Sequence, residues 1–384
     1  MATSAVIVGM RRTAVGSFRG ALKEVGAPAL GAAAARGAVL AAGLQPKDVQ
    51  ECFMGQVLQA GVGQAPARQA ALGAGCALDT PSTTVNKVCA SGMKAVMLAA
   101  AAVRCGDRSV VLAGGMESMS NAPHYLRVLR GGQGYGDAAL VDAIQHDGLT
   151  DAYDHVLMGK CSERVVKAAG LSRAEQDAFA IRSYELARAA QKQGLFSEEI
   201  CAVEIKGPKG NITATVLEDE ECKKFMPEKF AQLKPAFEKD GTITAANASK
   251  LNDGAAALVV MSDKEARARG LKPLARIVAY DDGAVEPWRF ALANSLATRK
   301  LLAKTKLAIK DIDLHEINEA FAAVPLLNAK ELGIDLDRVN VCGGGVALGH
   351  PIGASGARII ISLINSLRRQ DKTWGLASIC NGGG

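Results

Sequence analysis

The sequence has few aromatic residues and no long run of charge of one sign. Phe, Trp and Tyr make up only 4% of the 384 residues, which argues against a surface that stacks single-stranded nucleic-acid bases. No Lys/Arg cluster is long enough to be a polybasic tail, and the net charge is +6. This mild positive balance is compatible with an anionic small-molecule ligand. We therefore predict no nucleic-acid partner.

Long apolar runs, a secretory signal and metal-binding cysteine pairs are also missing. No apolar run reaches the ~18 residues that a membrane span needs, so we predict no membrane partner. The short apolar stretch Ala5–Val8 is followed at once by Arg11 and Arg12, which does not resemble a signal peptide. None of the nine cysteines forms a C-x-x-C pair, which argues against a zinc site. We expect free thiols in a reducing compartment.

The composition that remains is that of a globular protein with more than one domain. Apolar residues make up 49% of the chain and charged residues 22%, and 384 residues are too many for one ordinary core. Short apolar runs alternate with helical stretches, which predicts an α/β fold with a largely parallel sheet. The predicted strands are Ala5–Val8, Ser109–Ala113, Ala255–Met261, Ala275–Tyr280 and Gly375–Ile379.

An internal repeat indicates two similar α/β halves. Val88–Ala95 opens a long apolar helix in the first half, and His350–Arg358 does the same in the second. In both halves a strand that ends in glycines follows this helix, so a duplication is the economical interpretation. In the first half this strand should pair with Ala255–Met261. The second half stops at Gly384, where a corresponding last strand is expected and missing.

A stretch of different character separates the two halves. It is rich in Gly, charge and helix signals, including a capping box that begins at Ser172. Gly131–Gly136 within it predicts a loop tip rather than a phosphate-binding loop. We therefore predict an N-terminal half of residues 1–118 and 251–270, an inserted loop domain of residues 119–250 and a C-terminal half of residues 271–384.

Four short motifs contain residues suited to catalysis. Cys89 lies just before a helix start, where the helix dipole can favour a thiolate, although most cysteines are small buried hydrophobes. His350 follows a glycine-rich turn that allows close approach to a ligand. Cys380 ends a predicted strand, at the sheet edge where α/β proteins place their sites. Asn318, in Asn-Glu-Ala-Phe, is the fourth candidate.

Taken together, these motifs resemble the thiolase family over the whole chain. The segment around Cys89 is similar to the family's nucleophile loop, and residues 114–123 to the start of its loop domain. Asn318-Glu-Ala-Phe, Gly349-His350-Pro and Cys380-x-Gly resemble its other three catalytic motifs. Residues 244–254 are most similar to mitochondrial-type acetoacetyl-CoA thiolases. The resemblance implies a layered α-β-α-β-α core of two duplicated halves with an inserted loop domain.

The resemblance also implies a reaction and assigns roles. The expected activity is that of an acetyl-CoA C-acetyltransferase, which condenses two acetyl-CoA molecules or cleaves acetoacetyl-CoA. Cys89 is expected to become S-acetylated, His350 to take its proton, and Cys380 to remove the α-proton of the second substrate. Asn318 should hold a water that forms one oxyanion hole with His350 Nε2. The backbone N–H groups of Cys89 and Gly382 should form the other.

Substrate contacts follow from the same resemblance, with coenzyme A as substrate and no covalently bound cofactor. Ser249 is expected to contact the pantetheine arm, Met158 to line the acyl pocket, and a group beginning at Lys224 to bind adenine and phosphate. A Lys at 224 replaces the usual Arg, which loses the bidentate fork. The residues expected to contact coenzyme A are Met158, Tyr184, Lys224, Phe225, Met226, Lys229 and Ser249.

A potassium ion beside the coenzyme A site is a further expectation. The resemblance implies that the Tyr184 hydroxyl and the main-chain carbonyls of Ala245, Ala246, Ala248 and Val346 hold it. Neutral carbonyl oxygens suit K⁺, so no ring of carboxylates is required.

Departures from the family pattern and rival functions leave open questions about substrate range. Leu157 stands where the family usually has His, and Phe290-Ala291 where enzymes for branched substrates have Phe-Pro. A broader-range 3-ketoacyl-CoA thiolase of fatty acid β-oxidation and an inactive coenzyme A- or lipid-binding relative are alternatives. A ketoacyl synthase would lack Cys380.

Assembly and location are implied only by the resemblance. We expect a homotetramer, a dimer of dimers joined by loops near Asn121–Ala143. The expected compartment is the mitochondrial matrix, with the transit peptide removed, or the cytoplasm.

Overall fold

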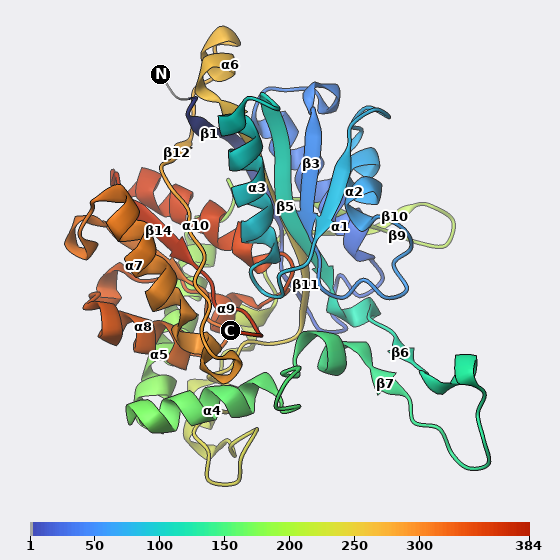
Figure 1. The fold of residues 1–384 in the computed structure, drawn as a ribbon, viewed down its shortest axis with the longest axis vertical. Coiled ribbons are helices and arrows are strands. Elements are labelled where there is room, and N and C mark those ends of the chain that lie inside the picture. The colour runs from blue at the N-terminus through green and yellow to red at the C-terminus, as the bar shows by residue number, and fades with distance from the viewer. Residues whose placement is uncertain (1–2) are drawn as a thin grey trace.

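Apolar strands form the centre of the protein in the computed structural model, which describes residues 3–384 (Figure 1). The first and larger sheet has a main path of six strands, and short strands β2 (Gly16–Ser17) and β8 (Ile200–Cys201) pair at its margins. Strand β8 belongs to the predicted loop domain, so that region also contributes to the sheet. The spatial order of the path is β12 (Ala275–Ile277), β1 (Ala5–Thr13), β11 (Asn252–Ser262), β5 (Val110–Ser118), β3 (Glu51–Gly55) and β4 (Ser82–Val85).

This sheet is mixed, so the prediction of a largely parallel sheet was wrong. Strand β1 runs antiparallel to both β11 and β12, and β11 runs antiparallel to β5. The parallel pairs are β3 with β4, β3 with β5, and β1 with the short β8. The long insertion before β11 frees that strand from the short helical crossover that would force a parallel direction. The predicted pairing of the Ser109 strand with Ala255–Met261 is confirmed, with Gly114 opposite Ala257.

Helices cover both faces of the first sheet and separate it from a second one. Helices α1 (Ala27–Ala41) and α2 (Pro66–Ala74) pack on one face. On the other face lie α3 (Ser91–Cys105) and α10 (Ser355–Arg369). The far side of α10 contacts the second sheet, so the predicted α-β-α-β-α layering is confirmed. That sheet consists of the parallel strands β13 (Leu314–Ile317) and β14 (Gly375–Ser378), with α7 (Ala293–Thr305) and α8 (Ala323–Leu332) outside it.

Helix α3 corrects the expectation about apolar length. The window Val88–Cys105 has 18 residues and a mean hydropathy of 1.5, which is long and apolar enough to cross a membrane by length and composition alone. The helix packs against β5, β3 and α10. Its apolar side chains therefore belong to the layer between the two sheets, where both faces must be hydrophobic.

The inserted region is helical next to the core and extends away from it elsewhere. Helix α5 (Arg173–Lys192) begins with the predicted capping box, in which Ser172 Oγ accepts from Glu175 N and Glu175 accepts from Ser172 N. Gly131–Gly136 forms the predicted exposed tip of an arm that projects from the molecule in Figure 1. The remaining elements are β6 (His124–Tyr125), β7 (Val141–Asp142), α4 (Met158–Ala169), β9 (Val203–Lys206), β10 (Ile212–Val216), α6 (Asp263–Ala268) and α9 (Gly345–Leu348).

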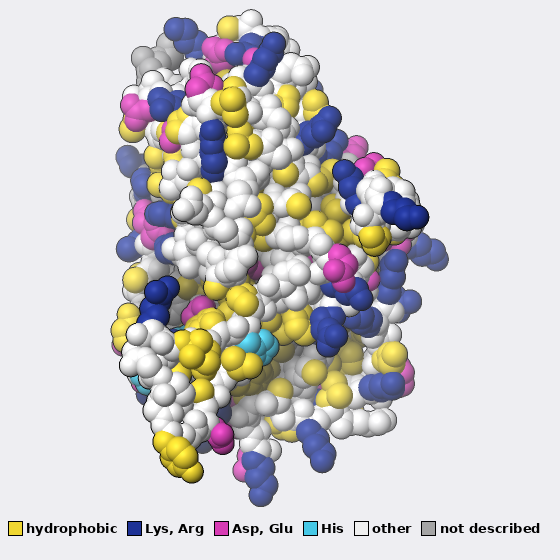
Figure 2. Space-filling model, turned by 90° about the vertical axis from the view of Figure 1, so that its right-hand side faces the viewer, with side chains coloured by type: hydrophobic (Ala, Val, Ile, Leu, Met, Phe, Trp, Pro, Cys, Tyr) yellow, Lys and Arg dark blue, Asp and Glu magenta, His cyan; other side chains and the backbone are white. Residues whose placement is uncertain are grey.

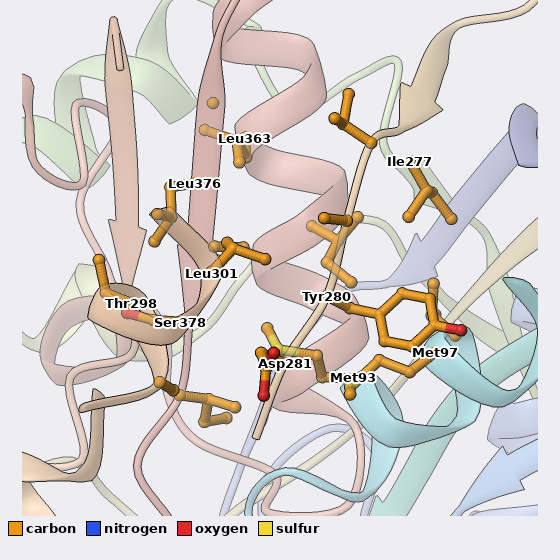
Figure 3. A pocket seen from close by; sticks show the side chains of 18 of the residues that line it. Met93, Met97, Ile277, Tyr280, Asp281, Thr298, Leu301, Leu363, Leu376 and Ser378 are labelled. Carbon is orange, nitrogen blue, oxygen red and sulfur yellow. The ribbon is translucent and has the colours of Figure 1, made fainter. Parts of the chain in front are cut away.

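The second sheet is much smaller than the first and faces a cavity of about 510 Å³. The cavity lies between β14 and the chain that follows β12, since residues 278–283 and 372–379 line it. Apolar side chains line it, including Met93 and Met97 of α3, Leu301 of α7, Leu363 of α10 and Leu376 of β14 (Figure 3).

Candidate active site

The loop that carries Cys89 has a strained backbone. Val88, directly before the cysteine, has a φ of 43°, which is a rare conformation for a β-branched residue. Hydrogen bonds hold it there: Val88 N donates to Asn86 Oδ1 at 3.0 Å, and Ser91 Oγ donates to Val88 O at 2.6 Å. Ser91 Oγ also accepts from Lys87 N at 2.8 Å. Such strain is common where a side chain must be presented in a fixed orientation.

Burial opposes the thiolate form that the position of Cys89 before a helix can favour. Withdrawal from solvent raises the pKa of Cys89 to about 11 and outweighs the backbone N–H groups of Gly382 and Cys89 that lower it. Burial also raises the pKa of Cys380, and the nearby Cys89 adds to that effect. The dipole of α3 does not compensate, because its first residue is Ser91, two positions beyond the cysteine. Activation of either thiol therefore requires a base.

His350 has the properties of that base. Its ring is buried, and desolvation lowers its pKa to about 3, so it is neutral. Nδ1 lies 2.6 Å from Ser355 Oγ, whose own proton goes to Pro351 O at 3.0 Å. The network therefore assigns the proton to Nδ1 and leaves the lone pair on Nε2. A second hydrogen bond, from His350 N to Asn252 Oδ1 at 2.9 Å, fixes the backbone.

Asn318 and Cys380 lie at the carboxyl ends of β13 and β14, which pair side by side. Asn318 Nδ2 is 3.5 Å from His350 Nε2, and its buried Oδ1 has no hydrogen-bond partner among the described residues. An oxygen in this state can receive a hydrogen bond from a water or a substrate group. All four sequence-predicted motifs therefore meet in one site: those of Asn318, His350 and Cys380, the last with Gly382, lie around the Cys89 loop.

Two residues that support the site were not predicted. The buried Glu117 carboxylate accepts from Val57 N and Gly353 N, both at 3.0 Å, and so joins the first half to the loop after His350. Burial raises its pKa to about 7. Ser355, which orients His350, was the second omission. Its position five residues after the histidine, at the first residue of a helix, was the available signal.

A second cavity, of about 790 Å³, reaches His350 from the surface. On the face shown in Figure 2, Lys and Arg side chains gather beside a hollow in the lower half of the molecule. The ring of Tyr184 stacks on that of Phe225, with 5.0 Å between centroids, and Phe225 lies on the cavity wall. All seven residues predicted to contact coenzyme A line this cavity: Met158, Tyr184, Lys224, Phe225, Met226, Lys229 and Ser249.

The residues predicted to bind potassium also come together, but a lysine lies among them. Ala245, Ala246 and Ala248 line the cavity wall beside Tyr184, and Val346 lies in α9 behind them. Lys250 Nζ donates to Ala248 O at 2.8 Å and to Val346 O at 3.2 Å. The sequence prediction did not assign any role to Lys250.

Comparison with known proteins identifies this arrangement. The model of the thiolase N-terminal domain matches residues 5–264, and that of the thiolase C-terminal domain matches residues 271–384. The chain belongs to the thiolase family. Its division into the two domains falls just before β12.

Relatives of this thiolase match it over nearly its full length. It is 52% identical over 380 residues to mitochondrial acetyl-CoA acetyltransferase A of Xenopus laevis, covering 99% of this chain and 89% of the relative. The human mitochondrial acetyl-CoA acetyltransferase is 50% identical, with 99% and 88% covered. The crystal structure of Acat5 thiolase from Ascaris suum in complex with coenzyme A superposes with a TM-score of 0.94 at 44% identity, covering 99% and 97%.

Two departures from the family pattern lie near the site of this thiolase. Leu157, the N-cap of α4, lines the 790 Å³ cavity and gives its wall an apolar side chain. Phe290 and Ala291 are buried in the cluster around Cys380, where the Phe290 and Phe321 ring centroids are 6.5 Å apart.

Proposed function

We propose that this thiolase is an acetyl-CoA C-acetyltransferase, which transfers an acetyl group between thiols and forms or cleaves a carbon–carbon bond. The observation that carries the proposal is that two thiols, Cys89 and Cys380, lie in one site with His350, whose ring proton is on Nδ1 and whose Nε2 can accept a proton. The Xenopus and human relatives, both named acetyl-CoA acetyltransferases, support the choice of acetyl-CoA as substrate.

The first half-reaction uses the neutral His350 ring and the Cys89 thiol. Nε2 of His350 removes the Cys89 proton as the sulfur attacks the thioester carbonyl, and the tetrahedral intermediate expels the coenzyme A thiolate, which takes that proton. The N–H groups of Cys89 and Gly382 already lower the pKa of the Cys89 thiol, so they stabilise negative charge at this point. Losing one such donor typically raises the barrier by ~2.7–4 kcal/mol.

The second half-reaction requires a second base. His350, neutral again after the first step, takes the proton of the Cys380 thiol, and the Cys380 thiolate removes the α-proton of another acetyl-CoA. The resulting carbanion attacks the acetyl carbonyl on Cys89, the bond to the Cys89 sulfur breaks, and this sulfur takes the proton from His350 as acetoacetyl-CoA is released. Asn318 Oδ1, which has no partner among the described residues, is suited to hold a water that stabilises the enolate oxygen together with protonated His350.

The division of labour between the thiols gives the test. Cys380→Ser should still form S-acetyl-Cys89 from acetyl-CoA, detected as added mass on that peptide, while condensation nearly stops because a hydroxyl is a far weaker base. Equal loss of acetylation and condensation would contradict the assigned roles. Thiolysis assays across 3-ketoacyl-CoA chain lengths would separate this enzyme from a broader-range β-oxidation thiolase.

We also propose that the seven cavity residues named above bind coenzyme A. Tyr184 stacked on Phe225 gives an aromatic wall, and the ammonium groups of Lys224 and Lys229 suit phosphate. The Ascaris suum thiolase, which has the same fold and was crystallised in complex with coenzyme A, supports this ligand. The predicted boundaries 1–118 with 251–270, 119–250 and 271–384 remain part of the proposal.

For assembly we propose a homotetramer joined through the β6–β7 arm. This arm exposes apolar side chains far from the core, including Leu129 at 65% and Leu140 at 68% exposure, and exposed apolar groups of this kind mark interfaces. Replacing both leucines with serine should reduce the mass in light scattering from tetramer to dimer. A protein that already runs as a monomer would refute the proposal. The mitochondrial relatives favour the matrix as its compartment.

The predicted potassium ion fits these residues poorly. Two of its expected carbonyl ligands, those of Ala248 and Val346, accept hydrogen bonds from the Lys250 ammonium. A potassium ion would have to displace the Lys250 ammonium or share its carbonyl partners, and two positive charges bound to the same oxygens repel each other. Potassium binding therefore stays a prediction, for which Lys250 offers an alternative.

A further inference from the structure

Lys250 occupies an enclosed position between the cavity and α9. Besides its two carbonyl partners, its Nζ lies 5.2 Å from the centroid of the Tyr184 ring. Two carbonyl oxygens and an aromatic face are all groups that attract a cation without carrying a full charge. Such a set resembles the coordination that a monovalent metal ion would use.

The charges around this position favour a cation. Burial lowers the pKa of Lys250 to about 8, so the ammonium form still predominates at neutral pH; the nearby carboxylates of Glu221 and Glu319 favour that form, and Lys224 opposes it. Lys224 is itself paired with Glu221 at 3.2 Å. Glu319 is buried and accepts from Val346 N at 3.0 Å, so it lies directly behind one of the two carbonyl partners. Both carboxylates therefore lie close enough to the Lys250 ammonium to attract it.

The contacts of Lys250 connect the substrate cavity to the catalytic loops. On one side is the Ala245–Ser249 turn, in which Ser249 N donates to Ala320 O at 3.0 Å, two residues after Asn318. On the other side is Val346, four residues before His350. One ammonium group thus ties together the turn that carries Ser249 and the glycine-rich segment that carries His350.

We propose that Lys250 is the built-in cation of this site and acts as a positioning residue in place of a bound monovalent metal ion. The expected effects on the KM for acetoacetyl-CoA rest on the proposed function. A tethered ammonium needs no association step, so its effect does not depend on the concentration of any salt. The protein should therefore be indifferent to potassium, unlike a site that must capture the ion from solution.

The test compares two variants of the same residue. Lys250→Met keeps the length of the side chain but removes its charge, and it fills the space. We expect its KM for acetoacetyl-CoA to rise about tenfold, as for the loss of one charged hydrogen bond, with no recovery in KCl. Lys250→Ala removes charge and volume, and we expect its KM and Tm to recover in KCl but not in choline chloride at the same ionic strength.

The wild-type protein and a matched control complete the design. Wild type should have the same KM and Tm in KCl, NaCl and choline chloride. Lys223→Ala removes another lysine of the same region, which within residues 3–384 forms an ion pair only with the exposed Glu218, and it should behave as wild type in every salt. A several-fold lower wild-type KM in KCl than in NaCl would overturn the proposal. So would a Lys250→Met variant with unchanged KM and Tm, or a Lys250→Ala variant without any potassium response.

A measurement independent of activity separates this proposal from the function itself. Crystals of the wild-type protein soaked in RbCl should show no anomalous peak between Ala248 O and Val346 O, whereas Lys250→Ala crystals should show one. A rubidium peak at that position in wild type would overturn the proposal even if thiolysis is normal. Absence of thiolysis with the expected diffraction result would instead count against the proposed function alone.

Discussion

Helices α3 and α10 are counterparts in the two halves, and they cross at their N-terminal ends. Each has 15 residues, and each has a glycine as its second residue. A Cβ at Gly92 would lie 2.9 Å from Gly353 O, and one at Gly356 would lie 2.5 Å from Met93 N. The crossing places the loops before the two helices side by side. One loop carries Cys89 and the other His350.

The first residue of each helix shows how far the correspondence goes. Ser91 Oγ donates to the carbonyl of Val88, and Ser355 Oγ donates to that of Pro351. Both hydroxyls fix the turn before their helix, but each accepts a different hydrogen bond. Ser91 accepts from a backbone N–H, whereas Ser355 accepts from the His350 ring. The duplicated fold therefore places a serine hydroxyl at the start of both helices. Ser91 stabilises the strained backbone of Val88, and Ser355 fixes the tautomer of the His350 ring.

The largest expected effect comes from removing the reactive group of the first loop. Cys89→Ala should abolish both acyl-enzyme formation and turnover, because the neighbouring thiol, Cys380, is assigned the role of base and not that of nucleophile. Mass spectrometry of the Cys89 peptide after acetyl-CoA treatment and a thiolysis assay measure the two effects. The fold should persist, since the change removes one atom from a half-buried side chain. Substantial residual turnover would mean that the nucleophile lies elsewhere.

The next prediction breaks the helix crossing itself. Gly356→Ala places a Cβ against the backbone of α3, and we expect a loss of about 1–3 kcal/mol in unfolding free energy, as for overpacking in a core. Urea denaturation measures it. Gly131→Ala is the matched control, because nothing lies within 4 Å of its added Cβ, and it should change stability by less than about 0.5 kcal/mol. Equal stabilities of the two variants would show that the crossing is not tight.

The paired serines sharpen the comparison between the loops. Ser355→Ala removes the acceptor for His350 Nδ1, and we expect turnover to fall roughly 10–100-fold, as for other groups that orient a functional histidine. Ser91→Ala should lower the Tm more than Ser355→Ala, because it releases the strained Val88 turn. Turnover and Tm measured for both variants test whether Ser355→Ala mainly lowers activity and Ser91→Ala mainly lowers stability. Identical profiles for the two would contradict the separate roles.

The sequence allowed the reactive residues to be predicted because their motifs are local. Glycines around His350 and the helix start after Cys89 lie within a few residues of the group that they position. Strand direction was not predictable in the same way, because β1, β5 and β11 meet only after a long insertion. The direction of β11 depends on how that insertion returns, which no local pattern encodes.

The position of a flexible side chain was also beyond the sequence. Lys250 has a four-carbon stem and no local signal for where its ammonium group lies. Its partner Val346 is 96 residues away, so the contact depends on how α9 packs against the Ala245–Ser249 turn. The thiol pKa values illustrate the same limit. Burial decides them, and burial follows from tertiary packing rather than from the nearby helix start.

The smallest expected effect concerns acid stability, where the two loops should differ. Burial lowers the pKa of His350 from the ordinary 6.5 to about 3, so between these values the unfolded chain binds a proton that the folded protein does not. The stabilising contribution is therefore present above pH 6.5 and is lost as the pH falls toward 3. One such group contributes at most about 1.4 kcal/mol per pH unit.

The comparison of two variants isolates this contribution. His350→Asn should lose less unfolding free energy than wild type when urea denaturation at pH 5 is compared with pH 7. Cys89→Ala should keep the wild-type pH dependence, because the pKa of Cys89 is about 11 and the thiol does not titrate in this range. Some acid sensitivity should remain in His350→Asn, since burial also lowers the pKa of His315 to about 4. A wild-type slope in His350→Asn would mean that folding leaves the pKa of His350 near its ordinary value of 6.5, contrary to the effect of burial.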